Sequence, residues 1–223
     1  MRDGSMRNWM SAFAGLALSA PLCASELTVR VNDQHGAPVP DAIVTLTPRL
    51  GTEIAASLVH PPARVHVIDQ KDETFIPYLE VFRAGDSVVF RNSDRTRHHV
   101  YSFAPVRPFE FMLLPGESSQ PLQLDKPGVI AVGCNIHDQM ITYLFVSDAA
   151  LIARAEKDGR AYLASAPPGS YDVRAWHPLL RPGEPDNAQT LTITTTGGGK
   201  ALAFALQLLP DPRRKADPER VSY

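Results

Sequence analysis

Short stretches in which apolar and polar residues alternate recur along most of the chain. The segment Leu27-Thr28-Val29-Arg30-Val31 is one example, and turn-forming segments such as Ala84-Gly85-Asp86 separate several others. A period of two residues is typical of half-buried β-strands, and many short strands with regular turns indicate an antiparallel sandwich or barrel. The pattern therefore predicts an essentially all-β chain. We expect strands at residues 27–31, 42–47, 66–70, 78–82, 87–91, 99–103, 121–124, 128–132, 141–146, 161–163, 171–176, 190–195 and 201–208.

Three segments depart from this alternation. Residues 148–158 favour the only plausible helix of the chain. Residues 48–63 are mixed in character and contain proline, which predicts an irregular connection. From Pro210 onward polar and charged residues predominate, so we expect residues 210–223 to form a flexible tail.

The N-terminus has the composition of a secretory signal. Arg2 and Arg7 precede an apolar stretch, Met10 to Leu22, that ends in the small residues Cys23-Ala24-Ser25. The apolar stretch is too short to span a bilayer comfortably. A buried N-terminal helix is the alternative interpretation. We predict a signal peptide over residues 1–25, a periplasmic or otherwise exported protein, and no membrane span in the mature chain.

Bulk composition narrows the choice of function. A length of 223 residues allows one large domain or two small ones, and 20 Pro against 14 Gly favours many turns and few long helices. The formal charge of −2 gives no polycationic signature, which excludes nucleic acid as an expected partner. Removal of the signal would leave Cys134 as the sole cysteine, which excludes a disulfide within the mature chain.

The segment around this cysteine places three ligand-type residues at intervals of three. Cys134, His137 and Met140 lie between two apolar stretches that we expect to be consecutive strands, so one short interstrand loop would carry all three. The adjacent pair His98-His99 supplies further imidazoles upstream. Two His, one Cys and a weak axial Met form the ligand set of trigonal electron-transfer copper sites. We therefore predict copper as the cofactor.

Two other chemistries use similar residues. Zinc accepts Cys and His, but a methionine is a poor zinc ligand. A catalytic Cys–His pair is formally present, yet no third orienting group or oxyanion-stabilising device is evident. We therefore predict that the protein is not an enzyme.

Residues 64–147 resemble the cupredoxins, the blue copper proteins. The residues that carry the resemblance are Phe75-Ile76-Pro77, Ala84 to Asn92, Pro127-Gly128 and Cys134-x-x-His137-x-x-Met140. The compact loop is most similar to the amicyanin/plastocyanin-like members, and the wider arrangement to proteins labelled methylamine utilisation proteins. The resemblance implies a Greek-key cupredoxin sandwich with one type 1 copper ion.

The resemblance also implies a ligand set. In cupredoxins the first His ligand lies six residues after the Asn that ends its strand, which selects His98 after Asn92. Cys134, His137 and axial Met140 follow from the loop. The family usually has Asn after the first His, where it ties the two ligand loops together. Here His99 holds that position and Asn135 follows the cysteine, so either the tie is reversed or His99 itself binds the metal. Whether Met140 or Asp138 faces the metal also stays open.

The flanking residues resemble a different module. Residues 27–48 resemble the opening hairpin of carboxypeptidase-regulatory-like, transthyretin-type β-sandwiches, and residues 158–163 and 168–173 resemble their middle and later strands. We assign residues 26–63 and 148–209 to this module. This resemblance implies a second small sandwich split by the inserted cupredoxin. The alternative is a tandem in which residues 26–50 complete the copper domain.

Together these inferences predict a periplasmic type 1 copper protein that transfers single electrons between redox partners. The resemblance implies that the partner is a periplasmic dehydrogenase or a c-type cytochrome. Two alternatives remain: a copper storage or delivery protein, and an interaction β-sandwich protein with a structural metal.

Overall fold

In the computed structural model, which describes residues 25–54, 61–181, 188–194 and 200–211, the regular secondary structure is β-strand. Within those residues no helix is long and apolar enough to cross a membrane. The signal-peptide prediction and most of the tail prediction fall outside the described residues. The strands are β1 (Ser25–Asp33), β2 (Ile43–Pro48), β3 (Val65–Lys71), β4 (Thr74–Ile76), β5 (Leu79–Arg83), β6 (Ser87–Asn92), β7 (His98–Ser102), β8 (Phe109–Leu113), β9 (Leu122–Gln123), β10 (Gly128–Cys134), β11 (Ile141–Ser147), β12 (Leu151–Arg154), β13 (Arg160–Ala166), β14 (Gly169–Trp176), β15 (Ala188–Ile193) and β16 (Lys200–Leu206).

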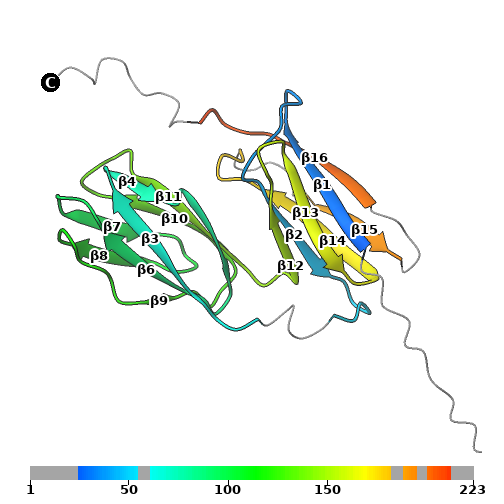
Figure 1. Ribbon diagram of the computed structural model, residues 1–223, viewed down its shortest axis with the longest axis horizontal. Coiled ribbons are helices and arrows are strands. Elements are labelled where there is room, and N and C mark those ends of the chain that lie inside the picture. The colour runs from blue at the N-terminus through cyan, green and yellow to red at the C-terminus, as the bar shows by residue number, and fades with distance from the viewer. Residues whose placement is uncertain (1–24, 55–60, 182–187, 195–199, 212–223) are drawn as a thin grey trace, which may run out of the picture.

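The strands form two β-sandwiches, each made of two sheets (Figure 1). One sandwich, here called the inserted sandwich, pairs the sheet β4-β3-β6-β9 with the sheet β5-β11-β10-β7-β8. The other, the outer sandwich, pairs β13-β1-β16 with β12-β2-β14-β15. In Figure 1 the inserted sandwich is cyan to green, whereas the outer sandwich mixes blue strands with yellow and orange ones.

Strand pairing shows how the chain runs between the two sandwiches. β1 pairs with β13 and β16, and β2 lies between β12 and β14. The first two strands therefore share sheets with the last five, and β3 to β11 are inserted between them. Neighbours such as β5 beside β11 and β7 beside β10 are far apart in sequence, as in Greek-key connectivity. The predicted fold class, an all-β chain built of β-sandwiches, is confirmed.

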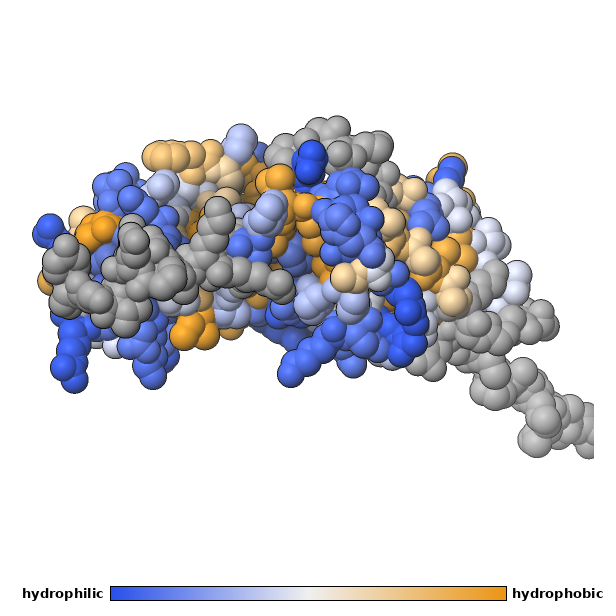
Figure 2. All heavy atoms as spheres, turned by 90° about the horizontal axis from the view of Figure 1, so that it is seen from above, coloured by the Kyte–Doolittle hydropathy of each residue, from blue (hydrophilic) through white to orange (hydrophobic). Residues whose placement is uncertain are grey.

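Alternation along the strands explains how the inserted sandwich acquires its core. In β6, Val88 and Phe90 are buried, whereas Arg91 is exposed. The Phe90 ring is fully buried and lies within 6.5 Å, centroid to centroid, of the rings of Phe75, Phe109 and Phe111. The outer sandwich has a separate core. Figure 2 shows that polar and apolar residues are intermixed on one face of the molecule.

The predicted helix over residues 148–158 is wrong. Residues 151–154 form β12, which pairs antiparallel with β2 from Leu151↔Leu46 to Arg154↔Ile43. Ala149 and Ala150, just before this strand, are almost completely buried. Intrinsic helix preference is only a weak determinant of structure. Here the hydrogen bonds that β12 forms with β2 and the burial of these two alanines outweigh it.

Polar and aromatic contacts join the two sandwiches. The Arg154 side chain of the outer sandwich donates a hydrogen bond to the Leu79 carbonyl of β5 at 2.5 Å. The Trp176 ring, at the end of β14, packs 5.0 Å from the ring of Phe145 and 6.3 Å from that of Tyr143 on β11. The guanidinium of Arg83 donates to the Ala149 and Ala150 carbonyls, so it fixes the segment that leads from β11 to β12.

A glycine in the outer sandwich gives a first testable consequence of the fold. Gly159 has φ +75°, and a Cβ there would lie 2.5 Å from the Val31 carbonyl oxygen. We expect Gly159→Ala to lower the free energy of unfolding by about 1–3 kcal/mol in urea denaturation. Gly36→Ala is the control, because Gly36 has φ +81° but open space around it. Equal losses in the two variants would show that the contact with Val31 is unimportant.

Candidate metal centre

Three side chains converge at one end of the inserted sandwich. His98 is the first residue of β7, and Cys134 is the last residue of β10. The two strands are paired through Cys134↔Val100, which brings the cysteine next to the start of β7. His137 lies in the loop that connects β10 to β11, as the sequence predicts. Residues distant in sequence are thus adjacent because of the β7–β10 pairing.

Alternation along β7 decides which of the two adjacent histidines enters the core. His98 and Val100 are fully buried, while His99 lies between them on the opposite face. A strand directs successive side chains to opposite faces, so only one member of the pair can face the interior. The structure places His98 inside.

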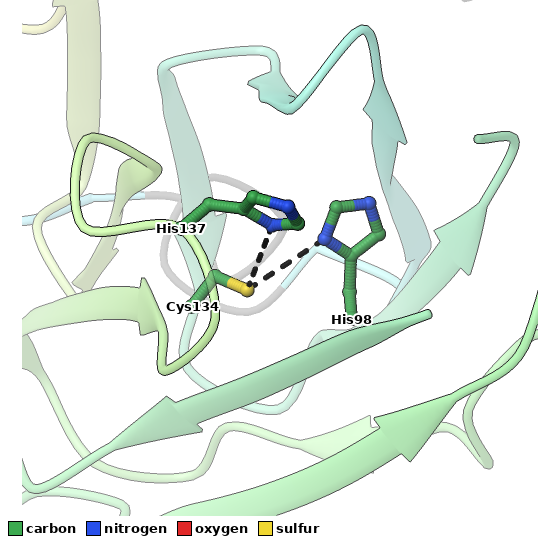
Figure 3. Close-up of side chains that lie close together, drawn as sticks. All are labelled: His98, Cys134 and His137. Atoms are coloured by element: carbon green, nitrogen blue, oxygen red, sulfur yellow. Dashed lines mark hydrogen bonds between the residues drawn. The ribbon is translucent and has the colours of Figure 1, made fainter. Parts of the chain in front are cut away.

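The potential ligand atoms of these three residues face one another (Figure 3). The Cys134 Sγ lies 3.6 Å from Nδ1 of His98 and 3.7 Å from Nδ1 of His137. All three atoms lie within 4.8 Å of one another. In the described part of the chain, no other group of three His, Cys, Asp or Glu side chains meets this criterion.

Burial differs sharply between the two imidazoles. The His98 side chain is completely buried, and Cys134 is 3% exposed. His137 keeps 15% of its side chain accessible at the surface. The cluster is therefore enclosed by the protein on the side of His98, and of its three side chains His137 is the most exposed to solvent.

The remaining predicted ligands fall into two groups. Met140 is 2% exposed and belongs to the same hydrophobic core as Cys134, and its N–H donates to the His137 carbonyl at 3.0 Å. That hydrogen bond closes the loop into a turn, and the role of the thioether as axial ligand stays a prediction. His99 and Asp138 are not members of the three-residue cluster, and Asp138 is exposed.

His99 is instead held by neighbours outside the cluster. Its Nε2 lies 2.5 Å from Glu110 Oε1, and its Nδ1 lies 3.3 Å from Asn135 Nδ2. The backbone N–H of Asn135 also donates to the His99 carbonyl at 3.0 Å. These contacts with Asn135 join β7 to the loop that follows Cys134, and a metal-binding role of His99 stays a prediction.

The Asn92 side chain holds the loop between β6 and His98 in place. Its side chain is fully buried, and Nδ2 donates to the carbonyls of Thr96 at 2.8 Å and Leu113 at 3.0 Å. Its Oδ1 accepts a hydrogen bond from the Asp94 N–H at 2.9 Å. One buried amide therefore satisfies three backbone groups and fixes the path of residues 93–97.

A carboxylate that the sequence interpretation missed lies against the buried imidazole. Asp94 Oδ2 is 2.7 Å from Nε2 of His98, and its side chain is only 10% exposed. Desolvation by burial, the largest single influence, acts to raise the pKa of this carboxyl. Hydrogen bonds from His98 and from the backbone N–H groups of Glu73 and Asp72 together outweigh it, so the pKa lies below its ordinary value. Asp94 is thus ionised near neutral pH.

The chemistry of the donor set suits a soft or borderline metal ion. A thiolate with two neutral imidazoles can bind copper or zinc, whereas hard cations prefer oxygen ligands. Both Nδ1 atoms face the sulfur, so all three donors are directed to a common point. The residues present therefore fit a copper ion held by His98, Cys134 and His137.

No known protein-family model matches the chain, and neither does any curated protein. Similar solved structures exist. A Cu-containing nitrite reductase (NirK) from Thermus scotoductus SA-01 is 22% identical with a TM-score of 0.35, over 45% of this chain and 25% of that one. A reduced amicyanin mutant is 19% identical with a TM-score of 0.35, over 47% of this chain and 98% of that one. A purple cupredoxin from Nitrosopumilus maritimus is 18% identical with a TM-score of 0.32, over 39% of this chain and all of that one.

Proposed function

We propose that the protein is an exported type 1 (blue) copper protein that transfers single electrons between redox partners. The observation that carries this proposal is the convergence of one cysteine sulfur and two imidazole Nδ1 atoms at the end of a β-sandwich. His98, Cys134 and His137 would hold the ion, with Met140 as a weak fourth ligand. When bound, copper would supply a one-electron couple between Cu(I) and Cu(II).

The protein holds the ligands of that couple through strand pairing and a buried side chain. Cys134 and His98 come from paired strands, and the buried Asn92 amide fixes the loop before His98. A ligand set that cannot rearrange keeps its geometry in both oxidation states. A three-coordinate arrangement with a long axial contact suits both states moderately well, so little reorganisation accompanies the gain or loss of an electron.

The exposure of His137 supplies a route for the electron. Its ring is partly accessible, whereas His98 and Cys134 are enclosed. A partner that docks over this edge would come closer to the ion than at any position over the buried imidazole. We propose a periplasmic dehydrogenase or a c-type cytochrome as the class of partner.

The visible spectrum of the copper-loaded protein tests the proposal. We expect Cu(II) addition to the metal-free full chain to produce an intense thiolate-to-copper absorption band, and cyclic voltammetry to show a reversible one-electron couple. Binding of zinc with no coloured copper form would contradict the proposal and favour a structural metal. Exchangeable Cu(I) without a reversible couple would contradict electron transfer and favour copper storage or delivery.

A further inference from the structure

The protonation pattern of His98 follows from its contact with Asp94. Both oxygens of the Asp94 carboxyl group already accept backbone N–H groups, so at the 2.7 Å contact His98 Nε2 is the donor and carries the proton. A neutral imidazole protonated at Nε2 has its free lone pair on Nδ1. That atom is the one facing Cys134 Sγ at 3.6 Å. The contact therefore presents the correct nitrogen to the metal before any metal binds.

The position of Asp94 is itself fixed by backbone groups from another part of the chain. Its Oδ1 accepts from the Asp72 N–H at 2.5 Å, and its Oδ2 accepts from the Glu73 N–H at 3.1 Å. Asp72 and Glu73 form the turn between β3 and β4 and have φ values of 53° and 52°. The Asn92 side chain also accepts a hydrogen bond from the Asp94 N–H, so both the backbone and the carboxylate of Asp94 are held in place.

The same turn reaches the second imidazole. Glu73 Oε1 lies 3.6 Å from Nε2 of His137, and the Glu73 side chain is 53% exposed. Each imidazole thus has a carboxylate beside the nitrogen that faces away from the sulfur. The buried Asp94 interacts in a region of low dielectric, whereas solvent screens Glu73. Asp94 is therefore the stronger of the two influences.

We propose that Asp94 is a positioning residue of the metal centre, which fixes the tautomer and orientation of His98 and lowers the reduction potential of the bound ion. This inference rests on the proposed copper site. Carboxylate–imidazole pairs behind metal ligands orient the ring and increase its basicity. A nearby negative charge stabilises the more positive oxidised ion over the reduced one, so the reduction potential falls.

The first measurement is made on the metal-free full chain. Long-range ¹H–¹⁵N NMR of wild type should show His98 protonated at Nε2 with an unprotonated Nδ1. In Asp94→Asn we expect a mixture of both tautomers, because an amide can either accept from Nε2–H or donate to Nε2. Glu110→Gln is the matched control, since it removes the carboxylate that contacts the adjacent His99, outside the cluster. An unchanged His98 tautomer in Asp94→Asn would overturn the positioning role.

The second measurement is made on the copper-loaded chain. We expect Asp94→Asn to bind copper about 10–100-fold more weakly and to have a more positive reduction potential than wild type. Glu110→Gln should change neither value appreciably. Asp94→Glu retains the charge, so its reduction potential should lie closer to that of wild type than the potential of Asp94→Asn does. This variant keeps the electrostatic role testable even if Asp94→Asn folds poorly. Equal potentials in Asp94→Asn and Glu110→Gln would overturn the electrostatic role. Failure to bind copper would refute the proposed function but leave the tautomer measurement as an independent test of Asp94.

Discussion

Replacing Cys134 by serine should abolish the intense visible absorption of the copper-loaded protein and weaken copper binding by more than about 100-fold. The expectation follows because the band requires a sulfur–copper bond, and a hydroxyl is a poor ligand for this ion. Changes to groups that only contact a ligand already cost about 10–100-fold in affinity, so loss of a ligand should cost more. Absorption spectroscopy and competitive copper titration measure the two effects.

Folding of the Cys134→Ser variant should be nearly intact. Serine is similar in shape, and its hydroxyl can donate to one of the two imidazoles that face Sγ. Circular dichroism of the metal-free protein should therefore match wild type. His99→Gln is the companion control, because His99 contacts Glu110 and Asn135. Retention of the visible band in Cys134→Ser, or its loss in His99→Gln, would contradict the ligand assignment.

The convergence of the cluster was largely predictable, because each part has a local signal. The three-residue spacing of Cys134 and His137 fits a single interstrand loop, and alternation along β7 allows only one of the two adjacent histidines to face inward. The structure brings together these two residues and His98, the histidine selected by its distance from Asn92. Metal binding itself stays a prediction, as does the axial role of Met140.

Asp94 was not found because its role depends on how a loop folds. The alternation of apolar and polar residues does not indicate that the loop over residues 93–97 places the Asp94 carboxylate beside the ring of His98. That path is set by the buried Asn92 amide and by the turn at Asp72 and Glu73, which comes from a different part of the sheet. The available signal was an acidic residue four positions before a histidine and two positions after a strand-ending asparagine.

Two of the strands that sequence reasoning missed have a weak alternation signal. β8 contains buried or half-buried Phe109, Phe111 and Leu113, but apolar Met112 falls between them and blurs the period. β12 is rich in residues that also suit a helix, and only its pairing with β2 makes it a strand. Long-range pairing of this kind has no local signature. The split outer sandwich could therefore be proposed from resemblance, whereas periodicity alone does not indicate it.

Separate cores predict separate effects on stability. Phe90 belongs to the core of the inserted sandwich, whereas the fully buried Leu46 belongs to that of the outer sandwich. Phe90→Ala should cost about 3–5 kcal/mol, and Leu46→Ala about 2–5 kcal/mol. Because the two cores have no residue in common, we expect each loss to fall mainly on its own sandwich.

Two optical signals can distinguish the sandwiches in one urea titration. The visible band of bound copper should report the inserted sandwich. A protein expressed without residues 1–25 lacks Trp9, so its fluorescence comes from Trp176 in the outer sandwich. We expect Phe90→Ala to shift the visible transition to lower urea, and Leu46→Ala to shift the fluorescence transition. The two sandwiches are in contact, because Trp176 packs on Phe145 and Arg154 binds the Leu79 carbonyl. We therefore expect each variant also to shift the transition of the other sandwich. That smaller shift should correspond to less than about 1 kcal/mol, the usual scale of such contacts. Equal shifts of both transitions in both variants would mean instead that these contacts couple the two sandwiches into one cooperative unit.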